Sequence, residues 1–395
     1  MSHNKLSILV ISLSTLFLTF ASGTPLVSVG DFADVSFSGS SSARWTSNVF
    51  RDETNETEDR VLTVSPGFEV SFGRGLSNFD LVLLTSYDIV RYNDNEDLDT
   101  EMFHIRMIGG YRTSRWDVSA QLSFDELQSA TGVANVTADL IESEDTRAKI
   151  SGEYRLSPKF SFGSGIDFSK KEYIEPANQF ANYDRLAIPL DLYYQLTPKV
   201  DLSVGYTHEV RELDPYTKPV DQLIEGYETT THFLNVGARG VILPKLTGFF
   251  KLGYRVRDSE STVGNPRDDS DGSLGLSSDL TWSTTPKLTN KVKLDRDFNV
   301  SGEGTVTENT AVSVSSNYFL NSFWSFGSNL GYTLRSYQDS NDREDVQTSA
   351  GISVNYTPNK YWSFSGAYSY SDNDSDAVGN SYTDHMISLT AFLRY

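Results

Sequence analysis

Apolar and polar residues alternate with a period of two along most of the chain after residue 33. Across residues 184–196 the even positions are mainly apolar, from Leu186 to Leu196, whereas odd positions carry Arg185 and Asp191. The same alternation recurs in later segments of similar length. Because successive side chains of a strand point to opposite faces, this period is typical of strands with one apolar and one polar face. The pattern therefore predicts an all-β chain.

Two kinds of connection alternate between the predicted strands. The long loops are mostly acidic, and examples cover residues 51–60, 93–101, 258–271, 339–345 and 372–376. The short turns often contain Pro-Lys, as in LTPKVDLSVGY over residues 196–206, and they begin at Gly73, Thr113, Ser157, Thr197, Leu243, Thr285, Asn321 and Thr357. One strand before the first loop, two around each of the eight turns and one after the last loop make 18 strands. Since each repeat of roughly 40 residues holds only two strands, we expect an up-and-down meander rather than a solenoid or a propeller.

Aromatic residues indicate that this sheet lies in a membrane. Those beside the short turns fall on the apolar phase of their strands, and they include Trp116, Tyr194, Trp282, Trp324, Trp362 and Tyr395. Such an aromatic girdle is typical of the interface between membrane and water. Because lipid offers the backbone no hydrogen-bonding partner, a sheet spans a membrane only when it closes on itself. We predict a transmembrane, up-and-down antiparallel β-barrel of 18 strands, with short periplasmic turns and longer extracellular loops. The alternative is a large soluble β-sandwich or propeller.

The first residues predict a secretory signal peptide. Lys5 precedes an apolar run over residues 6–20, and small residues suited to cleavage follow at residues 21–23. We expect residues 1–23 to be removed, which leaves a barrel over residues 24–395; an uncleaved anchor helix is the alternative. The run is shorter than the about 20 residues that a spanning helix needs, and no later segment approaches that length, which excludes a conventional helical membrane protein.

Composition and the C-terminal residues limit the classes of partner that the chain can have. A formal net charge of −20 argues against nucleic acid, which requires a basic surface. The absence of cysteine excludes disulfides and thiolate metal sites. The final MISLTAFLRY is an apolar alternation through Ile387, Leu389, Leu393 and Tyr395. This ending is similar to the C-terminal assembly signal of bacterial outer-membrane barrels, and the similarity implies the barrel-assembly machinery as a partner.

The recurrent hairpin pattern LTPK(V/L/F)-x-LS-x-GY and the stretch VSPGFEVSFGRGLSNFDL over residues 64–81 carry a resemblance. From the vicinity of residue 33 to its end, the chain resembles bacterial outer-membrane porins, and among them the putative beta-barrel porin (type 2) group. The resemblance implies a place in the Gram-negative outer membrane, in contact with its lipid and lipopolysaccharide. It also implies a porin-like activity, with a link of some members to surface-polysaccharide systems.

Charged residues occupy the polar phase, which faces the lumen of the predicted barrel. We expect the pore lining to include Arg106, Arg112, Arg155, Arg185, Arg239, Lys251, Arg255, Arg257, Lys291, Lys293, Glu153, Asp191, Asp201 and Asp295. Rows of opposite charge facing each other across a pore would orient and filter polar solutes. The alternative is ion pairing that only stiffens and solvates the interior. Either of two long connections, residues 130–145 and 214–229, would serve as an inward-folded constriction or would cover a neighbouring subunit.

No catalytic constellation and no cofactor site stand out. His104, His208, His232 and His385 lie far apart in the sequence, although residues of different strands could converge into a hydrolase site. The acidic loops, DNDSD at residues 372–376 included, are suited to loosely held Ca²⁺ or Mg²⁺ but not to a dedicated metal site.

We therefore predict a channel for passive diffusion of small polar solutes. The first alternative is a non-conducting or partner-gated barrel for polysaccharide export or attachment, and the second is an outer-membrane hydrolase. Monomer and trimer both fit the sequence.

Overall fold

The computed structural model describes residues 25–30, 32–73, 77–130, 140–213, 216–217, 223–224, 227–261, 269–300, 306–337 and 343–395. Within them, 18 long strands form one closed antiparallel barrel, as the alternation predicts. The predicted signal peptide, residues 1–23, lies outside the described residues.

The barrel strands follow one another in chain order. They are β2 (Ala33–Thr46), β3 (Asp59–Phe72), β4 (Phe79–Tyr92), β5 (Thr100–Arg112), β6 (Trp116–Ala130), β7 (Leu140–Arg155), β8 (Phe160–Tyr173), β9 (Tyr183–Thr197), β10 (Val200–Leu213), β13 (Tyr227–Leu243), β14 (Leu246–Ser261), β15 (Asp269–Thr285), β16 (Leu288–Val300), β17 (Val306–Phe319), β18 (Trp324–Tyr337), β19 (Glu344–Tyr356), β20 (Trp362–Ser375) and β21 (Tyr382–Arg394). Each pairs with its neighbours in sequence, and β2 pairs with β21 to close the ring.

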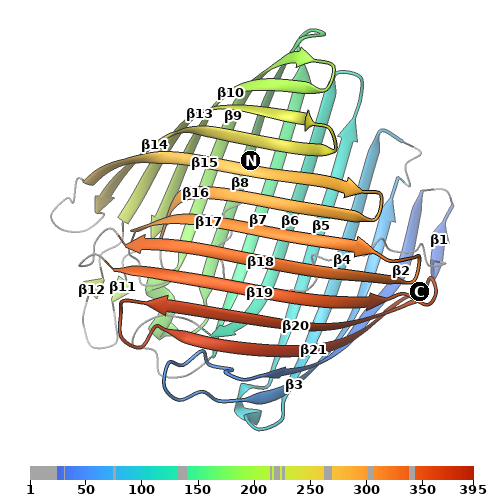
Figure 1. Ribbon diagram of the computed structural model, residues 1–395, viewed down its shortest axis with the longest axis vertical. Coiled ribbons are helices and arrows are strands. Elements are labelled where there is room, and N and C mark those ends of the chain that lie inside the picture. Colours follow the sequence, from blue (N-terminus) through green and yellow to red (C-terminus); the bar gives the residue numbers. More distant parts are fainter. Residues whose placement is uncertain are drawn as a thin grey trace.

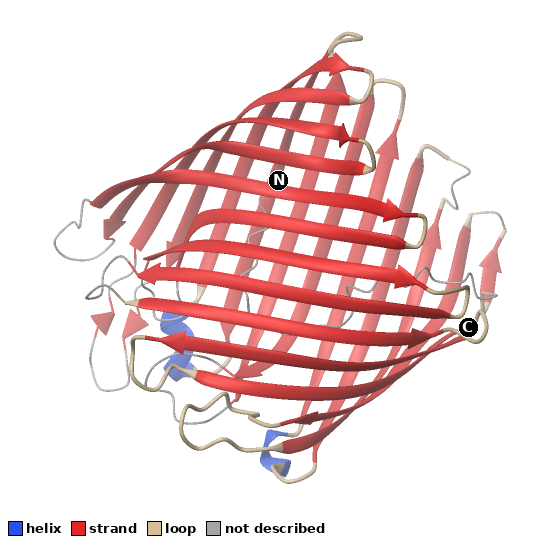
Figure 2. Cartoon of the chain, viewed as in Figure 1, coloured by secondary structure: helices blue, strands red, loops and turns tan. Residues whose placement is uncertain are grey.

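The barrel is flattened, so that two layers of strands face each other. Figure 1 shows β14–β21 as a front layer that crosses the fainter strands β4–β8 behind it. The layers meet at the top of that view through β9, β10 and β13, where the wall turns sharply. All eight predicted short turns lie at one end of the barrel, and the long loops lie at the other. Figure 2 shows how little of the chain is outside strands.

Side chains of Thr, Ser or Asn stabilise the short turns. Thr197 Oγ1 accepts hydrogen bonds from the backbone N–H groups of Lys199 and Val200. Asn321 and Asn359 do the same in the turns before β18 and β20. These residues hold a turn by replacing backbone acceptors with their own oxygen. The repeated Thr-Pro-Lys therefore supplies both a cap and a restricted φ.

Several features differ from the expectation. β20 runs to Ser375, so most of DNDSD is strand rather than loop, and β7 begins at Leu140, so residues 140–145 are not part of a long connection. The sequence pattern did not predict five short elements: β1 (Val27–Val29), β11 (Tyr216–Thr217), β12 (Leu223–Ile224), η2 (Glu96–Leu98) and η3 (Pro176–Ala181). In the described residues no helix is long and apolar enough to cross a membrane.

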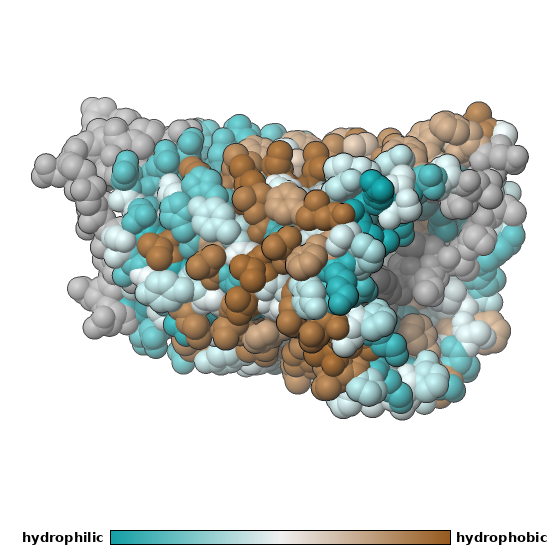
Figure 3. All heavy atoms as spheres, turned by 90° about the horizontal axis from the view of Figure 1, so that it is seen from above, coloured by the Kyte–Doolittle hydropathy of each residue, from teal (hydrophilic) through white to brown (hydrophobic). Residues whose placement is uncertain are grey.

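The outer surface is apolar although the barrel has almost no conventional core. Large aliphatic residues of the apolar phase are exposed there, for example Val204 at 57%, Leu234 at 63% and Ile352 at 63%. Figure 3 shows a broad brown area across the middle of one face, with hydrophilic residues towards either side. An exposed apolar band of this extent would be unstable in water, and it matches the lipid-facing band of a membrane barrel.

Candidate functional site

The lumenal wall is the candidate site, because the polar phase of every strand faces it. One part of the wall, formed by β7–β10 and β13–β16, is called here the charged arc. A second part, formed by β17–β20, is called the neutral arc, and β2–β6 with β21 complete the wall.

Arg185 on β9 is the centre of the charged arc. Its guanidinium is almost fully buried and contacts Glu209 on β10 at 2.8 Å and Asp167 on β8 at 3.3 Å. Arg211 approaches the other oxygen of Glu209 at 3.7 Å. Because every one of these charges meets an opposite charge, the desolvation cost of the buried arginine is offset. The cluster ties three adjacent strands together.

Arg239 spans more strands than any other described ion pair of this wall. From β13 it donates two hydrogen bonds to the Glu153 carboxylate on β7, at 2.7 and 2.8 Å, across β8, β9 and β10. It also contacts Asp201 at 3.0 Å, and its guanidinium carbon lies 3.4 Å from the ring centroid of Tyr193. Such reach is geometrically feasible only because side chains converge on the inner face of a sharp corner, the one visible at the top of Figure 1.

Lys251 and Asp191 form a second long-range pair. Lys251 Nζ lies 2.6 Å from Asp191 Oδ1, with side-chain exposures of 8% and 9%. β10 and β13 separate the two strands, and Gly205 lies directly opposite Asp191. A Cβ on Gly205 would approach Asp191 Oδ1 to 2.2 Å, so the carboxylate occupies the space that a side chain would need.

The remaining predicted pore-lining residues are distributed over the wall. Arg255 and Arg257 are buried and contact Asp297 at 2.9 Å and Asp271 at 3.1 Å. Lys291 and Lys293 share the Asp279 carboxylate at 3.8 and 3.5 Å, and each is about one-third exposed (34% and 32%). The other predicted residues lie on the inner phase outside these clusters. Asp295 is on β16, Arg106 and Arg112 are on β5, and Arg155 is at the short-turn end of β7.

In the described residues, the ion pairs of the charged arc join its own strands to one another. The β17–β20 wall carries hydroxyl and amide side chains on its inner phase: Ser313, Ser315, Asn317, Ser325, Asn329, Thr333, Gln347, Ser349, Ser353, Asn355, Ser363, Ser365, Ser369, Ser371 and Asn373. Within these strands the charged inner residues are Arg335 and Asp345, 3.9 Å apart near the loop end.

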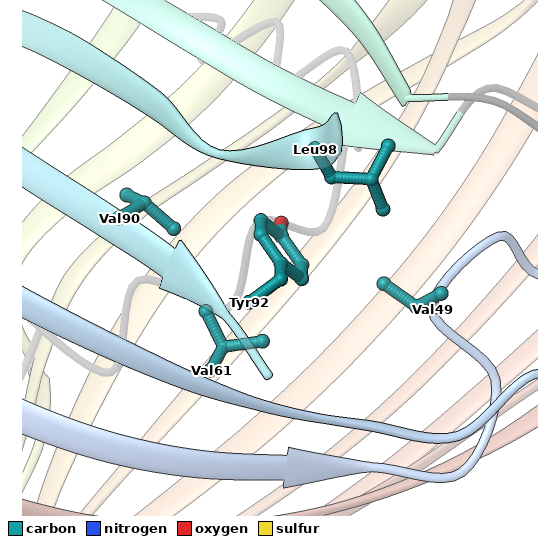
Figure 4. Close-up of a cluster of buried hydrophobic side chains, with 5 residues drawn as sticks. All are labelled: Val49, Val61, Val90, Tyr92 and Leu98. Carbon is teal, nitrogen blue, oxygen red and sulfur yellow. The ribbon is translucent and has the colours of Figure 1, made fainter. Parts of the chain in front are cut away.

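The β2–β3 loop covers part of the loop-side mouth. Figure 4 shows Val49 of this loop pointing towards Val61, Val90, Tyr92 and Leu98, with which it forms a buried apolar cluster. Two neighbouring polar contacts hold the loop on the inner surface. Asn48, 1% exposed, donates from Nδ2 to the Thr383 carbonyl, and its backbone N–H donates to Asp384.

An inward-folded constriction loop stays a prediction. All residues of 130–145 and 214–229 that are not in strands lie outside the described residues. For the β2–β3 loop the sequence predicts an acidic connection over residues 51–60. The two apolar residues just before its acidic run, Val49 and Phe50, were the signal for its inward packing.

Aromatic rings occur on the outer phase at the short-turn end. Trp116 packs on Tyr154 at 4.7 Å, Trp324 on Tyr356 at 4.5 Å and Tyr194 on Phe160 at 5.2 Å between centroids. Trp282, Trp362 and Tyr395 lie at the same end, with exposures of 47%, 40% and 49%.

The C-terminal residues form the closing strand. Ile387, Leu389 and Leu393 point outward opposite Trp45, Ala43 and Gly39 of β2. Beyond this register, Phe37 and Tyr395 exchange both backbone hydrogen bonds, at 2.6 and 2.8 Å. Arg394 faces inward and contacts Glu69 at 2.7 Å.

The histidines do not assemble into one site. His104 faces inward between Asp125 at 3.1 Å and Asp88 at 3.5 Å. His208 and His232 lie opposite each other on the outer phase, with ring centroids 5.3 Å apart, and His385 contacts the Tyr368 hydroxyl. Across the described segments, no group of three or more His, Asp or Glu side chains is arranged to hold a metal ion.

Some lumenal charges were not among the residues predicted to line the pore. Lys171, 1% exposed, lies 3.2 Å from Asp145 on the inner phase near the loop end. Asp145 belongs to the segment predicted to be a loop, because its outer-phase neighbours Glu142 and Glu144 are not apolar and give no strand signal. Strands that extend beyond the membrane carry no apolar outer face to reveal them.

The comparisons with known proteins agree with this architecture. No curated protein matches the chain. Among solved structures, the unliganded ferric citrate transporter FecA is similar with 12% identity and a TM-score of 0.50, over 88% of this chain and 60% of that one. This chain thus spans less than two-thirds of that transporter's length. OpdK from Pseudomonas aeruginosa (10% identity, TM-score 0.45) and OccAB3 from Acinetobacter baumannii (12%, 0.45) each match over 92% of this chain and 99% of theirs.

The family match is more informative than these distant structural likenesses, which concern the fold alone. It extends over residues 27–395, which include every strand of the barrel. The chain is a porin-like outer-membrane barrel, and it belongs to the family described as Putative beta-barrel porin 2.

Proposed function

We propose that the barrel is an outer-membrane channel through which small polar solutes diffuse passively. The observation that carries the proposal is the polar lumenal wall with its two unlike arcs. The charged arc offers partners to ionic groups, and the neutral arc offers hydroxyl and amide partners to uncharged polar groups. A barrel of 18 strands encloses more space than side chains fill, which favours an aqueous path between the arcs.

Ion pairing in the charged arc keeps the field in the lumen small. Lys291 and Lys293 are the residues that we propose face solutes, because each lies beside the Asp279 carboxylate and each remains about one-third exposed. Two partly exposed ammonium groups on this part of the wall would favour anions slightly over cations.

Conductance of the purified protein in a planar bilayer tests this function. We expect steady ohmic steps with a weak preference for chloride over potassium in a salt gradient. The double variant Lys291→Glu with Lys293→Glu should shift the reversal potential towards cation preference. Lys170→Glu makes the same kind of charge change on the outer phase, beside Glu172, and should leave the reversal potential unchanged. A properly folded barrel without conductance would refute the channel.

A silent barrel would favour the rival function, a non-conducting or partner-gated barrel for polysaccharide export or attachment. The β2–β3 loop packed inward at the mouth is the observation that favours this rival. Hydrolysis of lipid or peptide by the purified protein would instead revive an enzyme, which the arrangement of the histidines does not support.

The same proposal includes the envelope context. A signal peptide at residues 1–23 would direct export, and the C-terminal strand would engage the barrel-assembly machinery. Trp116, Trp282, Trp324 and Trp362 would lie at headgroup depth on the periplasmic side. The acidic loops would contact lipopolysaccharide through loosely bound Ca²⁺ or Mg²⁺.

A further inference from the structure

The wall of the barrel is not continuous between β15 and β16. β15 pairs with β14 from Asp269 to Trp282, but it pairs with β16 only from Leu276 onward, opposite Arg296. β16 itself continues along β17 as far as Val300. Residues 269–275 of β15 therefore have no strand partner on that side within the part of the chain that the structure describes. In Figure 1, β15 runs on to the left while β16 curves away from it.

This seam opens near the outer boundary of the apolar band. Trp282 marks the short-turn end of β15, and Leu274 lies eight positions further along the strand. With the usual rise and tilt, eight residues cover roughly 20 Å of membrane normal, against an apolar band of about 25 Å. Leu274 is 52% exposed on the outer phase, next to Tyr254 at 56%. An unpaired strand edge at this depth is costly in lipid, so the wall must be closed there by something other than backbone pairing.

Phe298 lies on β16 beside the seam. Its position in β16 belongs to the outer phase, yet the side chain is only 4% exposed. The guanidinium of Arg257, which belongs to the inner phase of β14, lies 5.4 Å from its ring centroid. The phenyl ring thus lies between the membrane side and the lumenal side of the wall.

An arginine pair lies directly behind this ring. Arg255 crosses over Gly275 of β15 to reach Asp297 on β16, and a Cβ on Gly275 would approach Arg255 Cγ to 2.8 Å. The Arg255 guanidinium also lies 3.9 Å from the ring centroid of Phe233. Among the described residues, Arg255 Nε and Nη2 and Arg257 Nε have no hydrogen-bond acceptor, although both side chains are about 2% exposed. Buried guanidinium N–H groups without acceptors favour an anion.

A second interruption, between β5 and β6, provides the contrast. There the strands pair only from His104 onward, opposite Asp125. Side chains close that gap: the Phe103 N–H donates to Glu126 at 2.6 Å, and Gln128 donates to the Leu98 carbonyl at 3.0 Å. Neither kind of bridge is found among the described residues of the β15–β16 seam beyond Leu276.

We propose that the β15–β16 seam is a lateral portal, closed by Phe298, for a single-chain anionic amphiphile. The carboxylate of such a molecule would bind the free N–H groups of Arg255 and Arg257. Its alkyl chain would lie along Phe298, Phe233 and Leu274 and extend into the outer leaflet. This path is lateral and independent of the axial channel proposed above.

The test uses a palmitate analogue with a diazirine in its chain, added to liposomes that contain the full barrel. After illumination and proteolysis, mass spectrometry should find the label on Phe233, which belongs to the inner phase, as well as on Leu274. Because the chain contains no cysteine, a single disulfide can be introduced across the seam with Leu274→Cys and Phe298→Cys. These two positions would face each other if the pairing of Leu276 with Arg296 continued. This disulfide should lower labelling of Phe233 at least tenfold, and a reductant should restore it.

The matched control is Leu280→Cys with Val292→Cys, which face each other where β15 and β16 are paired, and it should change nothing. An uncharged alcohol with the same diazirine chain should label Phe233 several-fold less than the acid. Every variant is first checked for a folded barrel by its heat-dependent gel mobility.

Labelling of Phe233 that persists with the disulfide closed, or that is absent in the unmodified protein, would overturn the portal. Equal labelling by the alcohol would overturn the anionic ligand. Bilayer conductance should be the same with the disulfide open or closed, so failure of the portal is distinguishable from failure of the channel.

Discussion

Lys251 Nζ lies 2.6 Å from Asp191 Oδ1, although β10 and β13 separate the strands that carry the two residues. The contact requires a sharp turn of the wall at β9, β10 and β13. It also requires backbone without a side chain beneath the pair, and Gly205 supplies part of that backbone. The pair is therefore a property of the closed barrel rather than of either strand.

Gly205→Ala should weaken the corner without changing the topology. The new Cβ would lie 2.2 Å from Asp191 Oδ1 and 2.7 Å from Asn235 Oδ1, so the carboxylate must move away from Lys251. We expect a loss of about 1–3 kcal/mol in the free energy of unfolding, measured by urea denaturation in detergent micelles. Gly152→Ala is the control, because its Cβ would meet only Val118 Cγ2, at 3.9 Å. Equal stability of the two variants would contradict the close approach.

Removing one partner of the pair should cost more than removing both. Lys251→Met or Asp191→Leu alone leaves a buried charge without its partner, and each should lose about 3–5 kcal/mol of unfolding free energy. The double variant should recover most of that loss, because no unpaired charge remains. Additive losses in the double-mutant cycle would show that the two residues do not interact in the membrane.

Val49→Asp should widen the mouth of the channel. A carboxylate is not stable among Val61, Val90, Tyr92 and Leu98, so the β2–β3 loop would leave the inner surface. We expect a larger single-channel conductance in planar bilayers than for the unmodified protein. Val378→Asp introduces the same charge at a loop position that is 96% exposed and should have no effect. A decrease on Val49→Asp would indicate that the loop does not limit the flow.

Deletion of Tyr395 should impair closure of the barrel. The deletion removes two backbone hydrogen bonds to Phe37 and the ring that stacks on Tyr361, with centroids 5.6 Å apart. We expect a smaller folded fraction after expression, measured as the heat-modifiable band on a gel. Tyr361→Ala removes the stacking alone and should reduce this fraction less. An equal reduction in both variants would assign the effect to the ring rather than to strand pairing.

Most of the fold could be predicted from the sequence. The period of two assigns each residue to a face, and the eight short turns divide the chain into strands, because both depend on neighbours in sequence. Lys251, Arg255 and Arg257 therefore lie on the inner phase where alternation placed them. Near the loops the prediction was weaker, as the strand residues 140–145 and 372–375 show. There the outer face leaves the lipid and loses its apolar character.

What the tertiary structure decided is which lumenal groups meet. Alternation could not show that Arg239 reaches Glu153 across three strands. Nor could it show that pairing of β15 with β16 ends at Leu276 and that Phe298, on the outer phase just beyond, is buried. Side-chain phase is a local property of an extended backbone, whereas ion pairs over several strands depend on register, curvature and closure. The sequence by itself determined the barrel and its two faces; only the folded wall determined its chemistry.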